Sequence, residues 1–419
     1  MERALLVTIE VDSEKEGWKL EDMALELEEL TATCGAEAVD NITCLRDRPT
    51  PNLFIGKGKA EELALACQEL GVDTVIFSHD LSGTQQRNLE EVIGKKTIDR
   101  TQLILDIFAR HAKTPEGKMQ VELAQLQYLF PRLVGKGIIL SRLGGGIGTR
   151  GPGEQKLEVD RRRIRKRIDN LKENLKQVSL HRATMRKRRK GIATPIVALV
   201  GYTNAGKSTL LNALTNAGQV VADSLFTTLD PLSKNLKLPN GENIVILDTV
   251  GFLHDLPHHL IEAFKATLEE VVEADLLINV LDVSNPLAHK FNSSVFEVLK
   301  ELGVESKPMI TVLNKIDLLT DQSWLAKQGE DFINPVAISA SLRQNLDKLL
   351  EKIEATFESR MAYLELLIPH ARMDLIDLFY RQGKVEEIKY LQKGIKIRVM
   401  LPKIISASIL KDKEIEKIS

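Results

Sequence analysis

The stretch Pro195-Ile-Val-Ala-Leu-Val-Gly-Tyr-Thr-Asn-Ala-Gly-Lys-Ser208 decides the fold of this chain. Its first half is an apolar run typical of a buried strand, and from Gly201 it matches the pattern G-x-x-x-x-G-K-[ST]. The segment TLLNALT that follows predicts a helix. A strand, a glycine-rich loop and a helix in this order predict a loop whose backbone N–H groups bind phosphates at a helix N-terminus. We expect Lys207 to reach the β- and γ-phosphates and the Ser208 hydroxyl to bind Mg²⁺.

A second motif, Asp248-Thr-Val-Gly251, follows the apolar run IVIL. A carboxylate at the end of a strand can hold a water of the Mg²⁺ shell, so Asp248 is a predicted metal contact through water. The Gly251 N–H can meet the γ-phosphate and sense its loss. The motif follows the first one in the order and at the distance that are typical of nucleotide switches. This favours a switch over a simple turn.

Two further motifs predict recognition of guanine. Asn314-Lys-Ile-Asp317 ends the apolar run MITVL, and Ser339-Ala-Ser341 follows PVAI. The Asp317 carboxylate can accept from N1–H and the 2-amino group of guanine, whereas adenine would leave it unpaired, a difference that can discriminate by about 10⁴–10⁵. The Ala340 N–H could donate to guanine O6. Four motifs in order, each at the carboxyl end of a strand, predict a doubly wound P-loop GTPase domain over 193–360.

A threonine-containing loop lies between the first two motifs. In Phe226-Thr-Thr-Leu-Asp-Pro231 a threonine can close over the γ-phosphate and offer Mg²⁺ a hydroxyl and a carbonyl. By chemistry alone Thr227 and Thr228 both qualify. We expect the loop to become ordered with GTP and to loosen after hydrolysis. The predicted nucleotide contacts are Gly201, Tyr202, Thr203, Asn204, Ala205, Gly206, Lys207, Ser208, Thr209, Phe226, Thr227, Thr228, Leu229, Asp230, Asp248, Thr249, Val250, Gly251, Asn314, Lys315, Ile316, Asp317, Ser339, Ala340 and Ser341.

Two residues of this predicted site bear on the rate of hydrolysis. Phe252 stands where many GTPases place a glutamine, and phenylalanine cannot hydrogen-bond the attacking water. We therefore expect slow unaided hydrolysis, on the order of 10⁻⁴–10⁻² s⁻¹, with large stimulation by a partner. Asn204 stands where potassium-activated GTPases carry an asparagine, so K⁺ is a second candidate cation. The alternative is an asparagine selected for turn geometry.

The rest of the chain predicts three further parts. Strand-like and helix-like patterns alternate over 1–113, which predicts a parallel α/β domain. Residues 114–192 show two helical patterns around a glycine-rich loop at 144–153, and apolar residues in the second helix repeat every three or four positions. This pattern predicts an antiparallel helical hairpin with coiled-coil packing. Residues 361–419 predict a small α/β domain, or a last strand pair packed elsewhere. The fold class is thus a multidomain α/β protein.

The charge is strongly segregated along the chain. Of 419 residues with a net charge of −2, the segment 150–190 holds sixteen Lys or Arg against five acids, a net of +11. A solvated helix face usually mixes signs, and RRRIRKR does not. We therefore predict contact with RNA or DNA phosphates rather than base stacking, because the run contains no aromatic residue. The predicted RNA contacts are Arg142, Arg150, Arg161, Arg162, Arg163, Arg165, Lys166 and Arg167.

At these motifs the chain resembles the translation-factor-related GTPases and, more narrowly, the HflX family. The resemblance lies in GYTNAGKST, FTTLDP, DTVGF and NKID, in SRLGGGIGTRGPGEQKLEVDRRRI upstream of them, and in IGKGKAEEL near Ile55. It implies a ribosome-associated GTPase that binds the large subunit and separates the subunits. It also implies Thr228 as the switch threonine on Mg²⁺, so the implied catalytic set is Lys207, Thr228 and Gly251. The family usually has F-A-T-L-D-P, so Thr227 is a small departure.

Three other functions are less consistent with the sequence. An RNA-binding or remodelling NTPase could use ATP in its N-terminal domain through Gly56-Lys-Gly-Lys59, although a turn before a helix also explains that loop. A tRNA-modifying GTPase would carry a late catalytic cysteine, and this chain has none after Cys67. A membrane-signalling GTPase is disfavoured because no lipidation motif is present.

The remaining patterns predict a reduced, monomeric protein in the cytoplasm. The three cysteines, Cys34, Cys44 and Cys67, show no C-x-x-C spacing, so we expect neither disulfides nor a zinc site. No signal peptide or transmembrane run is evident. His254, Asp255, His258 and His259 could hold a metal, but such clusters more often lie on a polar loop.

Overall fold

We describe the protein from a computed structural model. The chain forms two compact units: the first is mainly Met1–Leu180, and the second is made of His181–Val221, Pro231–His254 and Thr267–Ser419. Short segments, Ala222–Asp230 and Asp255–Ala266, belong to the first unit. The structure describes residues 1–11, 18–133, 152–189, 194–215, 226, 232–255, 257, 260, 265–319, 331–410 and 415–418.

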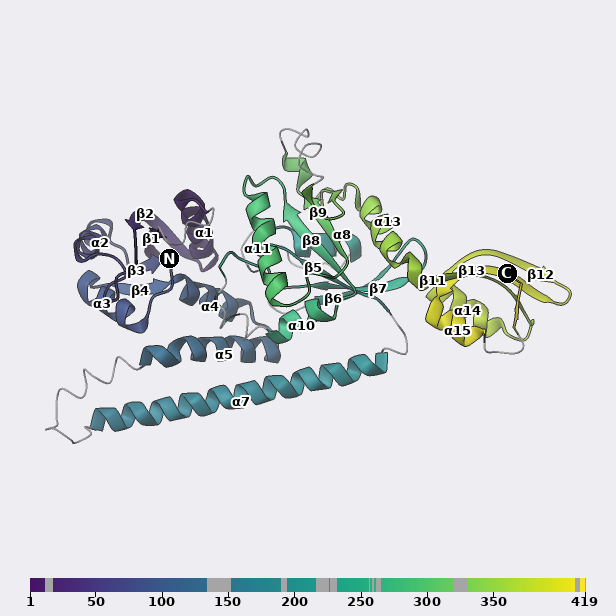
Figure 1. Cartoon of the computed structure of the whole chain (residues 1–419), viewed down its shortest axis with the longest axis horizontal. Helices are drawn as coiled ribbons and strands as arrows, with labels where there is room; N and C mark the ends of the chain where they lie inside the picture. Colours follow the sequence, from purple (N-terminus) through teal and green to yellow (C-terminus); the bar gives the residue numbers. More distant parts are fainter. Residues whose placement is uncertain are drawn as a thin grey trace. The chain divides into compact units, whose positions relative to one another are not determined.

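The N-terminal part of the first unit is a four-stranded parallel sheet in the order β2-β1-β3-β4 (Figure 1). Alternate residues of its central strand, Leu5, Val7 and Ile9, pack in one core with residues of helices α2 and α3, so the period of two in the sequence decides which side chains meet. The elements are β1 (Glu2–Val11), α1 (Leu20–Thr33), β2 (Ala36–Arg46), α2 (Lys57–Leu70), β3 (Thr74–Phe77), α3 (Gly83–Ile93), β4 (Lys96–Asp99) and α4 (Arg100–His111).

Two long helices follow, α5 (Pro115–Arg132) and α7 (Pro152–Arg189). They pack on each other through Leu123 of α5 and the buried Leu171 and Leu175 of α7. Leu171 and Leu175 lie on the coiled-coil seam predicted for the second helix, so the helical hairpin is confirmed for the residues described. Residues 144–151 of the predicted glycine-rich loop lie outside the described residues, and residues 152 and 153 begin α7.

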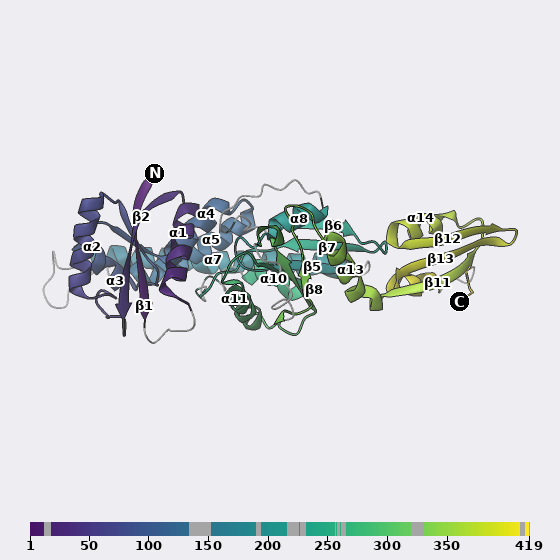
Figure 2. The ribbon, with the colours of Figure 1, turned by 90° about the horizontal axis from the view of Figure 1, so that it is seen from above.

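The second unit contains a six-stranded sheet in the order β10-β9-β8-β5-β7-β6. Figure 2 labels four of its strands, β5, β6, β7 and β8. One core cluster joins this sheet to helices α8 and α13, and a second cluster joins it to α11. Its elements are β5 (Ile196–Val200), α8 (Lys207–Thr215), β6 (Leu232–Lys237), β7 (Asn243–Asp248), α10 (Lys265–Glu273), β8 (Leu276–Asp282), α11 (Ala288–Glu301), β9 (Met309–Asn314), η3 (Ile316–Leu318), β10 (Val336–Ala337), α13 (Leu346–Phe357) and η5 (Glu358–Arg360).

The apolar runs in the sequence predict a parallel sheet, but the observed sheet is not wholly parallel. Strand β6 lies at its edge and pairs antiparallel with β7. The sequence of β6, LSKNLK, alternates between half-buried and exposed residues, as is usual for an edge strand with one solvated face. Its pattern is too polar and too short to be found by looking for continuous apolar runs.

The C-terminal part of the second unit forms a sheet of its own. Its strands pair antiparallel in the order β12-β13-β11-β14, and helices α14 and α15 pack on one core with them. The small α/β domain is therefore observed, and the alternative of a strand pair packed elsewhere is wrong. The elements are β11 (Met361–Ile368), α14 (Met373–Gln382), β12 (Lys384–Leu391), β13 (Gly394–Pro402), α15 (Lys403–Ile409) and β14 (Glu416–Lys417).

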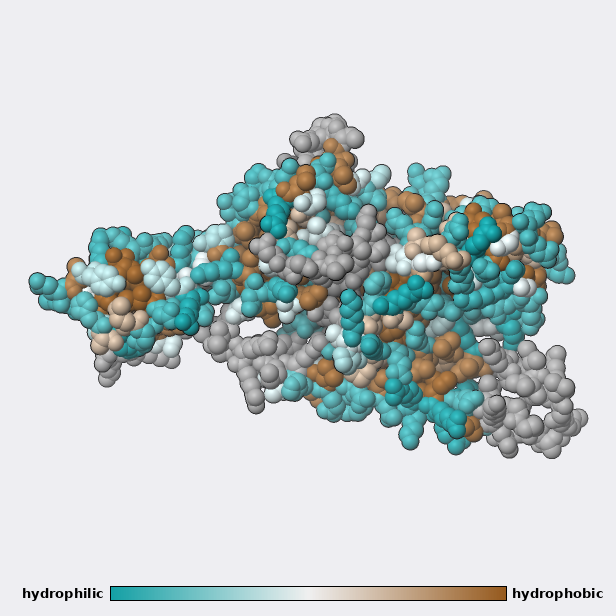
Figure 3. All heavy atoms as spheres, turned by 180° about the vertical axis from the view of Figure 1, so that it is seen from behind, coloured by the Kyte–Doolittle hydropathy of each residue, from teal (hydrophilic) through white to brown (hydrophobic). Residues whose placement is uncertain are grey.

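The predicted multidomain α/β class is thus confirmed. Among the described residues, no helix is both long enough and apolar enough to cross a membrane. On the face drawn in Figure 3, hydrophilic residues cover much of the surface, with hydrophobic residues between them. The three cysteines are buried and free of disulfides, as the sequence predicts, and burial raises the pKa of each thiol.

Candidate functional site

The four sequence motifs meet at the carboxyl ends of strands β5, β7, β9 and β10. Hydrogen bonds join them in pairs. The Ser208 hydroxyl donates to Asp248 Oδ2 over 2.6 Å, which links the first motif to the second. Asn314 Nδ2 donates to the Ala205 carbonyl over 2.8 Å, and Asn314 Oδ1 accepts from the Ala340 N–H over 3.0 Å. Residues more than a hundred positions apart in the chain therefore form one candidate site.

The glycines of the first motif are required by the backbone. Gly201 has a φ of +145°, and a Cβ there would lie 2.3 Å from the Val280 carbonyl oxygen. Gly206 has a φ of +96°, and a Cβ there would lie 2.3 Å from Asn314 Nδ2. A side chain at either position would be strained and would collide with a neighbour. The loop is therefore built for a backbone path that only glycine allows, immediately before helix α8.

Lys207 is almost completely buried beneath this loop. Its Nζ donates to the Gly201 carbonyl over 3.1 Å and to the Tyr202 carbonyl over 2.7 Å. Burial lowers the pKa of the ammonium group to about 8, and the nearby Asp248 carboxylate partly opposes that shift. The ammonium group is thus stretched along the inside of the loop, where the sequence places the phosphates.

Ser208 and Asp248 form the part of the site that suits a divalent cation. Both residues are buried, and their side-chain oxygens lie 2.6 Å apart. A hydroxyl and a carboxylate are oxygen ligands of the kind that Mg²⁺ prefers. The residues therefore fit the predicted metal.

The segment 248–254, which contains the second motif, lies directly on the phosphate loop. A Cβ at Gly251 would lie 2.8 Å from Thr203 Cγ2 and 3.1 Å from Lys207 Nζ, so only glycine fits. The Phe252 N–H donates to the Gly201 carbonyl over 3.1 Å, and the Thr203 N–H donates to the Phe252 carbonyl over 2.9 Å. The Phe252 ring is buried, so this residue contributes its backbone to the site rather than a polar side chain.

The motifs predicted to bind guanine also lie together. Asp317 is exposed, and the Ser341 hydroxyl lies 3.5 Å from its carboxylate. Lys315 has a positive φ of 64° and pairs with Asp282, Nζ to Oδ2 being 2.7 Å. The Ala340 N–H, which the sequence assigns to guanine O6, donates here to Asn314. The sequence did not single out Asp282; its place at the end of strand β8 was the available signal.

Part of the predicted site falls on residues that are not described. Thr227, Thr228, Leu229 and Asp230 lie outside the described residues. Phe226 is described within the first unit, where its ring lies edge-on to that of Phe108 with centroids 4.6 Å apart. The structure thus places a residue of this loop against helix α4.

The other predicted nucleotide contacts lie on the loop and strand ends already described. Asn204 has a φ of 59°, a left-handed conformation that asparagine tolerates well, so turn geometry is sufficient to explain its presence. The Thr249 hydroxyl donates to the Leu199 carbonyl over 2.6 Å and so joins β7 to β5. Thr209 lies in the first turn of α8, Val250 and Ile316 are apolar members of their motifs, and Ser339 is buried beside Ala340.

The predicted RNA contacts have different surroundings along α7. Arg162, Arg163, Arg165, Lys166 and Arg167 are exposed. Arg167 also donates two hydrogen bonds, of 2.6 and 2.8 Å, to the Glu122 carboxylate on α5. Arg161 and Arg165 lie over the Phe130 ring, 5.5 and 5.3 Å from its centroid, so α5 supplies an aromatic residue that the basic run lacks. Arg142 and Arg150 lie outside the described residues.

Two minor candidate sites receive less support from the structure. Gly56 is the N-cap of α2, and Lys57 and Lys59 pair with Glu61 and Glu62 of the same helix, as expected for a turn before a helix. Among the described residues, no group of three His, Cys, Asp or Glu could hold a metal ion. His258 and His259, which the sequence groups with His254 and Asp255, lie outside the described residues.

Comparisons with known proteins agree with the geometry. Family models match three consecutive segments: GTP-binding GTPase N-terminal over 21–109, GTP-binding GTPase Middle Region over 111–189 and 50S ribosome-binding GTPase over 196–315. The GTPase HflX of Caldanaerobacter subterraneus subsp. tengcongensis is 48% identical over 95% of this chain and 90% of its own length.

The chain belongs to the HflX family of GTPases. The HflX of Escherichia coli is 41% identical over 96% of this chain and 94% of its own length. Among solved structures, SsGBP with GDP is 27% identical with a TM-score of 0.48, covering 85% of this chain and 98% of that one. As a member of the HflX family with a P-loop GTPase domain, the protein hydrolyses GTP.

Proposed function

We propose that this HflX-family GTPase binds the large ribosomal subunit and separates the ribosomal subunits, with GTP hydrolysis stimulated by the ribosome. The observation that carries the proposal is the exposed basic run of α7, including Arg162, Arg163 and Lys166. Such a face attracts RNA phosphates and would make binding depend strongly on salt. The matching model over 196–315, named 50S ribosome-binding GTPase, supports the same partner.

The phosphate end of GTP would be held by the first two motifs. Lys207 would exchange its bonds to loop carbonyls for bonds to the β- and γ-phosphates, and the Gly251 N–H would face the γ-phosphate. Ser208 would bind Mg²⁺ directly, Asp248 would bind it through water, and Thr228 would complete the set from the switch loop. Bound Mg²⁺ neutralises charge that develops on the phosphates.

The base and the second cation complete the proposed site. Asp317 would accept from guanine N1–H and the 2-amino group, which ATP cannot satisfy. K⁺ is part of the proposal through Asn204 alone, because its charge near the phosphates would favour hydrolysis. Equal hydrolysis rates in Na⁺ and K⁺ buffers would remove K⁺ from the mechanism.

The division of labour along the chain is also proposed. Residues 1–113 and 361–419 would flank a hairpin of 114–192 that contacts RNA and a GTPase domain of 193–360. Because Phe252 offers the attacking water no polar side chain, the free chain would hydrolyse GTP slowly and the ribosome would complete the arrangement. A monomer acting in the cytoplasm is the simplest form of this proposal.

The decisive experiment measures GTP hydrolysis and co-pelleting with isolated large subunits at rising salt. Contact with about six to ten phosphates should reduce the affinity by roughly 10³–10⁵ between 50 and 200 mM salt. A variant with Arg162→Glu and Lys166→Glu should lose binding while its unstimulated hydrolysis stays unchanged. The matched control, Lys384→Glu with Lys393→Glu, reverses two exposed charges of the C-terminal sheet and should bind normally.

One result with isolated large subunits would contradict the proposal. Large subunits that neither bind the chain in any nucleotide state nor accelerate its hydrolysis would exclude the ribosome as the partner. Equal loss of binding in both double variants would assign the attraction to net charge rather than to α7.

A further inference from the structure

Tyr202, the second residue of the phosphate loop, makes a contact that its motif does not require. The Tyr202 side chain is buried, and its hydroxyl accepts a hydrogen bond of 3.0 Å from the backbone N–H of His254. The ring stacks on that of Phe291 from α11, with centroids 4.1 Å apart and planes 15° from parallel. The motif G-x-x-x-x-G-K-[ST] accepts any residue at this position, so the tyrosine calls for a reason of its own.

The hydroxyl contact extends a backbone pairing between the loop and the segment 248–254. Tyr202 and Phe252 form a parallel bridge, in which the Phe252 N–H donates to the Gly201 carbonyl and the Thr203 N–H donates to the Phe252 carbonyl. The bond from His254 to the Tyr202 hydroxyl adds a third attachment two residues further along. Three hydrogen bonds, made by Phe252 and His254 just after Gly251, restrict the backbone that positions the Gly251 N–H.

Phe291 connects Tyr202 to the side of the site predicted to hold the base. It packs against a buried cluster that contains Leu281 and Leu313, together with Ile316 of the Asn314–Asp317 motif. The Tyr202 ring is therefore supported from the guanine motif while its hydroxyl holds the segment after Gly251. The Tyr202 carbonyl in addition accepts from Lys207 Nζ over 2.7 Å.

We propose that Tyr202 is a positioning residue for GTP hydrolysis, whose hydroxyl fixes the backbone of the segment 248–254 on the phosphate loop. The need for it follows from Phe252. A glutamine at that position could itself orient the attacking water, whereas here the alignment of the reacting groups rests on the backbone. Holding the His254 N–H fixes the chain two residues after Phe252, which replaces the glutamine.

Tyr202→Phe tests this role directly, because it removes the hydroxyl and keeps the stacked ring. We expect single-turnover GTP hydrolysis by the free chain to fall about three- to tenfold, the range for one lost hydrogen bond. The affinity for a fluorescent GDP analogue should change by less than about twofold, because the substitution leaves the backbone of the phosphate loop and Lys207 in place. Hydrogen exchange at the His254 amide should become faster because the amide loses its acceptor. A lower rate without a matching loss of GDP affinity is the result that a purely structural role would not produce.

Two further variants make the test specific. Tyr363→Phe removes a hydroxyl from an exposed residue of the C-terminal sheet and should leave rate, affinity and His254 exchange unchanged. Phe291→Leu keeps the hydroxyl but removes its stacked support, so it should lower the rate by a smaller factor. A wild-type rate in Tyr202→Phe would overturn the proposal, as would unchanged His254 exchange or equal losses of rate and GDP affinity. None of these measurements includes ribosomes, so the outcome is independent of the proposed partner.

Discussion

Two aspartates, one in each unit, occupy the same kind of position and have opposite surroundings. Asp99 ends strand β4 of the N-terminal sheet, and Asp248 ends strand β7 of the nucleotide-binding sheet. Both side chains are completely buried. The carboxyl end of a parallel strand is where α/β proteins usually place their ligands, so position alone would make either residue a candidate for chemistry.

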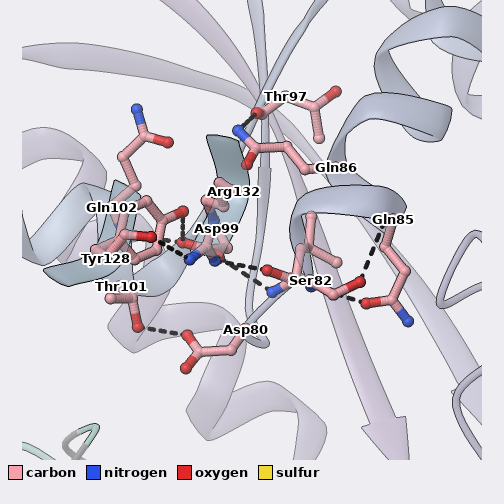
Figure 4. A network of polar contacts seen from close by, with 11 residues as sticks. Asp80, Ser82, Gln85, Gln86, Thr97, Asp99, Thr101, Gln102, Tyr128 and Arg132 are labelled. Atoms are coloured by element: carbon pink, nitrogen blue, oxygen red, sulfur yellow. Dashed lines mark hydrogen bonds and ion pairs between the residues drawn. The ribbon is translucent and has the colours of Figure 1, made fainter. Parts of the chain in front are cut away.

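The Asp99 carboxylate is saturated by groups of its own unit (Figure 4). Its Oδ1 accepts from the Tyr128 hydroxyl over 2.8 Å and from the Gln102 N–H over 2.9 Å. Its Oδ2 accepts from Arg132 Nη2 over 2.9 Å and from the Leu81 N–H over 3.0 Å. Burial raises the pKa of Asp99, and these donors and the Arg132 charge oppose the rise.

The network around Asp99 joins the end of helix α5 to the N-terminal sheet. Arg132 also donates to the Leu81 and Tyr128 carbonyls and lies 3.4 Å from the centroid of the Tyr128 ring. Asp248, in contrast, has a serine hydroxyl and a buried lysine beside it, the groups that a metal ion and phosphates require. The donors around a strand-end carboxylate, rather than its location, therefore distinguish an anchoring residue from a candidate catalytic one.

The largest expected effect separates the two aspartates by activity. Asp248→Asn removes the charge proposed to hold the Mg²⁺ shell, so the rate of GTP hydrolysis should fall at least about a hundredfold. The free energy of unfolding should change little. Asp99→Asn should hydrolyse GTP at the normal rate. The measurement is single-turnover hydrolysis at saturating GTP and Mg²⁺. A rate for Asp248→Asn within tenfold of the wild type would contradict its assignment.

The second largest effect separates the two aspartates by stability, and here Asp99 is the sensitive residue. Asp99→Ala leaves the mostly buried Arg132 guanidinium without its carboxylate, so the first unit should lose about 3–5 kcal/mol of unfolding free energy. Denaturation followed by Trp18 fluorescence in a Trp324→Phe background reports on the N-terminal sheet. Asp40→Asn, an exposed change on β2, is the control. A loss below about 1 kcal/mol would mean that the Asp99 network contributes little.

A third prediction concerns the charge beside Asp248. Burial lowers the pKa of Lys207 to about 8, and bound phosphates would raise it again because they favour the ammonium form. GDP binding at about pH 8.5 should therefore take up most of one proton, and binding at about pH 7 should take up almost none. Calorimetry in buffers of different ionisation enthalpy measures this uptake. Lys207→Arg, which stays charged, should bind without it, and equal uptake by both proteins would contradict the assignment.

The smallest expected effect tests how the Asp99 network shares its energy. Tyr128→Phe removes one donor and keeps the ring beneath Arg132, so the stability of the first unit should fall by about 1–2 kcal/mol. Trp18 fluorescence in the same Trp324→Phe background measures the change. If Tyr128→Phe proves as costly as Asp99→Ala, the phenol rather than the guanidinium is the principal partner.

The local features of this protein are encoded in short stretches of its sequence. The four motifs, the buried strands before them and the apolar seam of the second hairpin helix are each encoded in one short stretch of consecutive residues. Local spacing is sufficient for these features because a strand has a period of two, a helix has a period of about 3.6, and the phosphate loop needs glycines at fixed offsets. The family resemblance rests on the same short segments.

Contacts between distant side chains depend on how the sheets are folded. The bond from Asn314 to Ala205 spans 109 positions, the bond from His254 to the Tyr202 hydroxyl spans 52, and the Tyr128 contact with Asp99 spans 29. Strand β6 has too polar a pattern to be predicted from apolar runs, and its antiparallel pairing with β7 identifies it. Hydrogen bonds and ring stacking act over a few ångströms, so residues far apart in the sequence acquire these roles when the sheets bring their strand ends together.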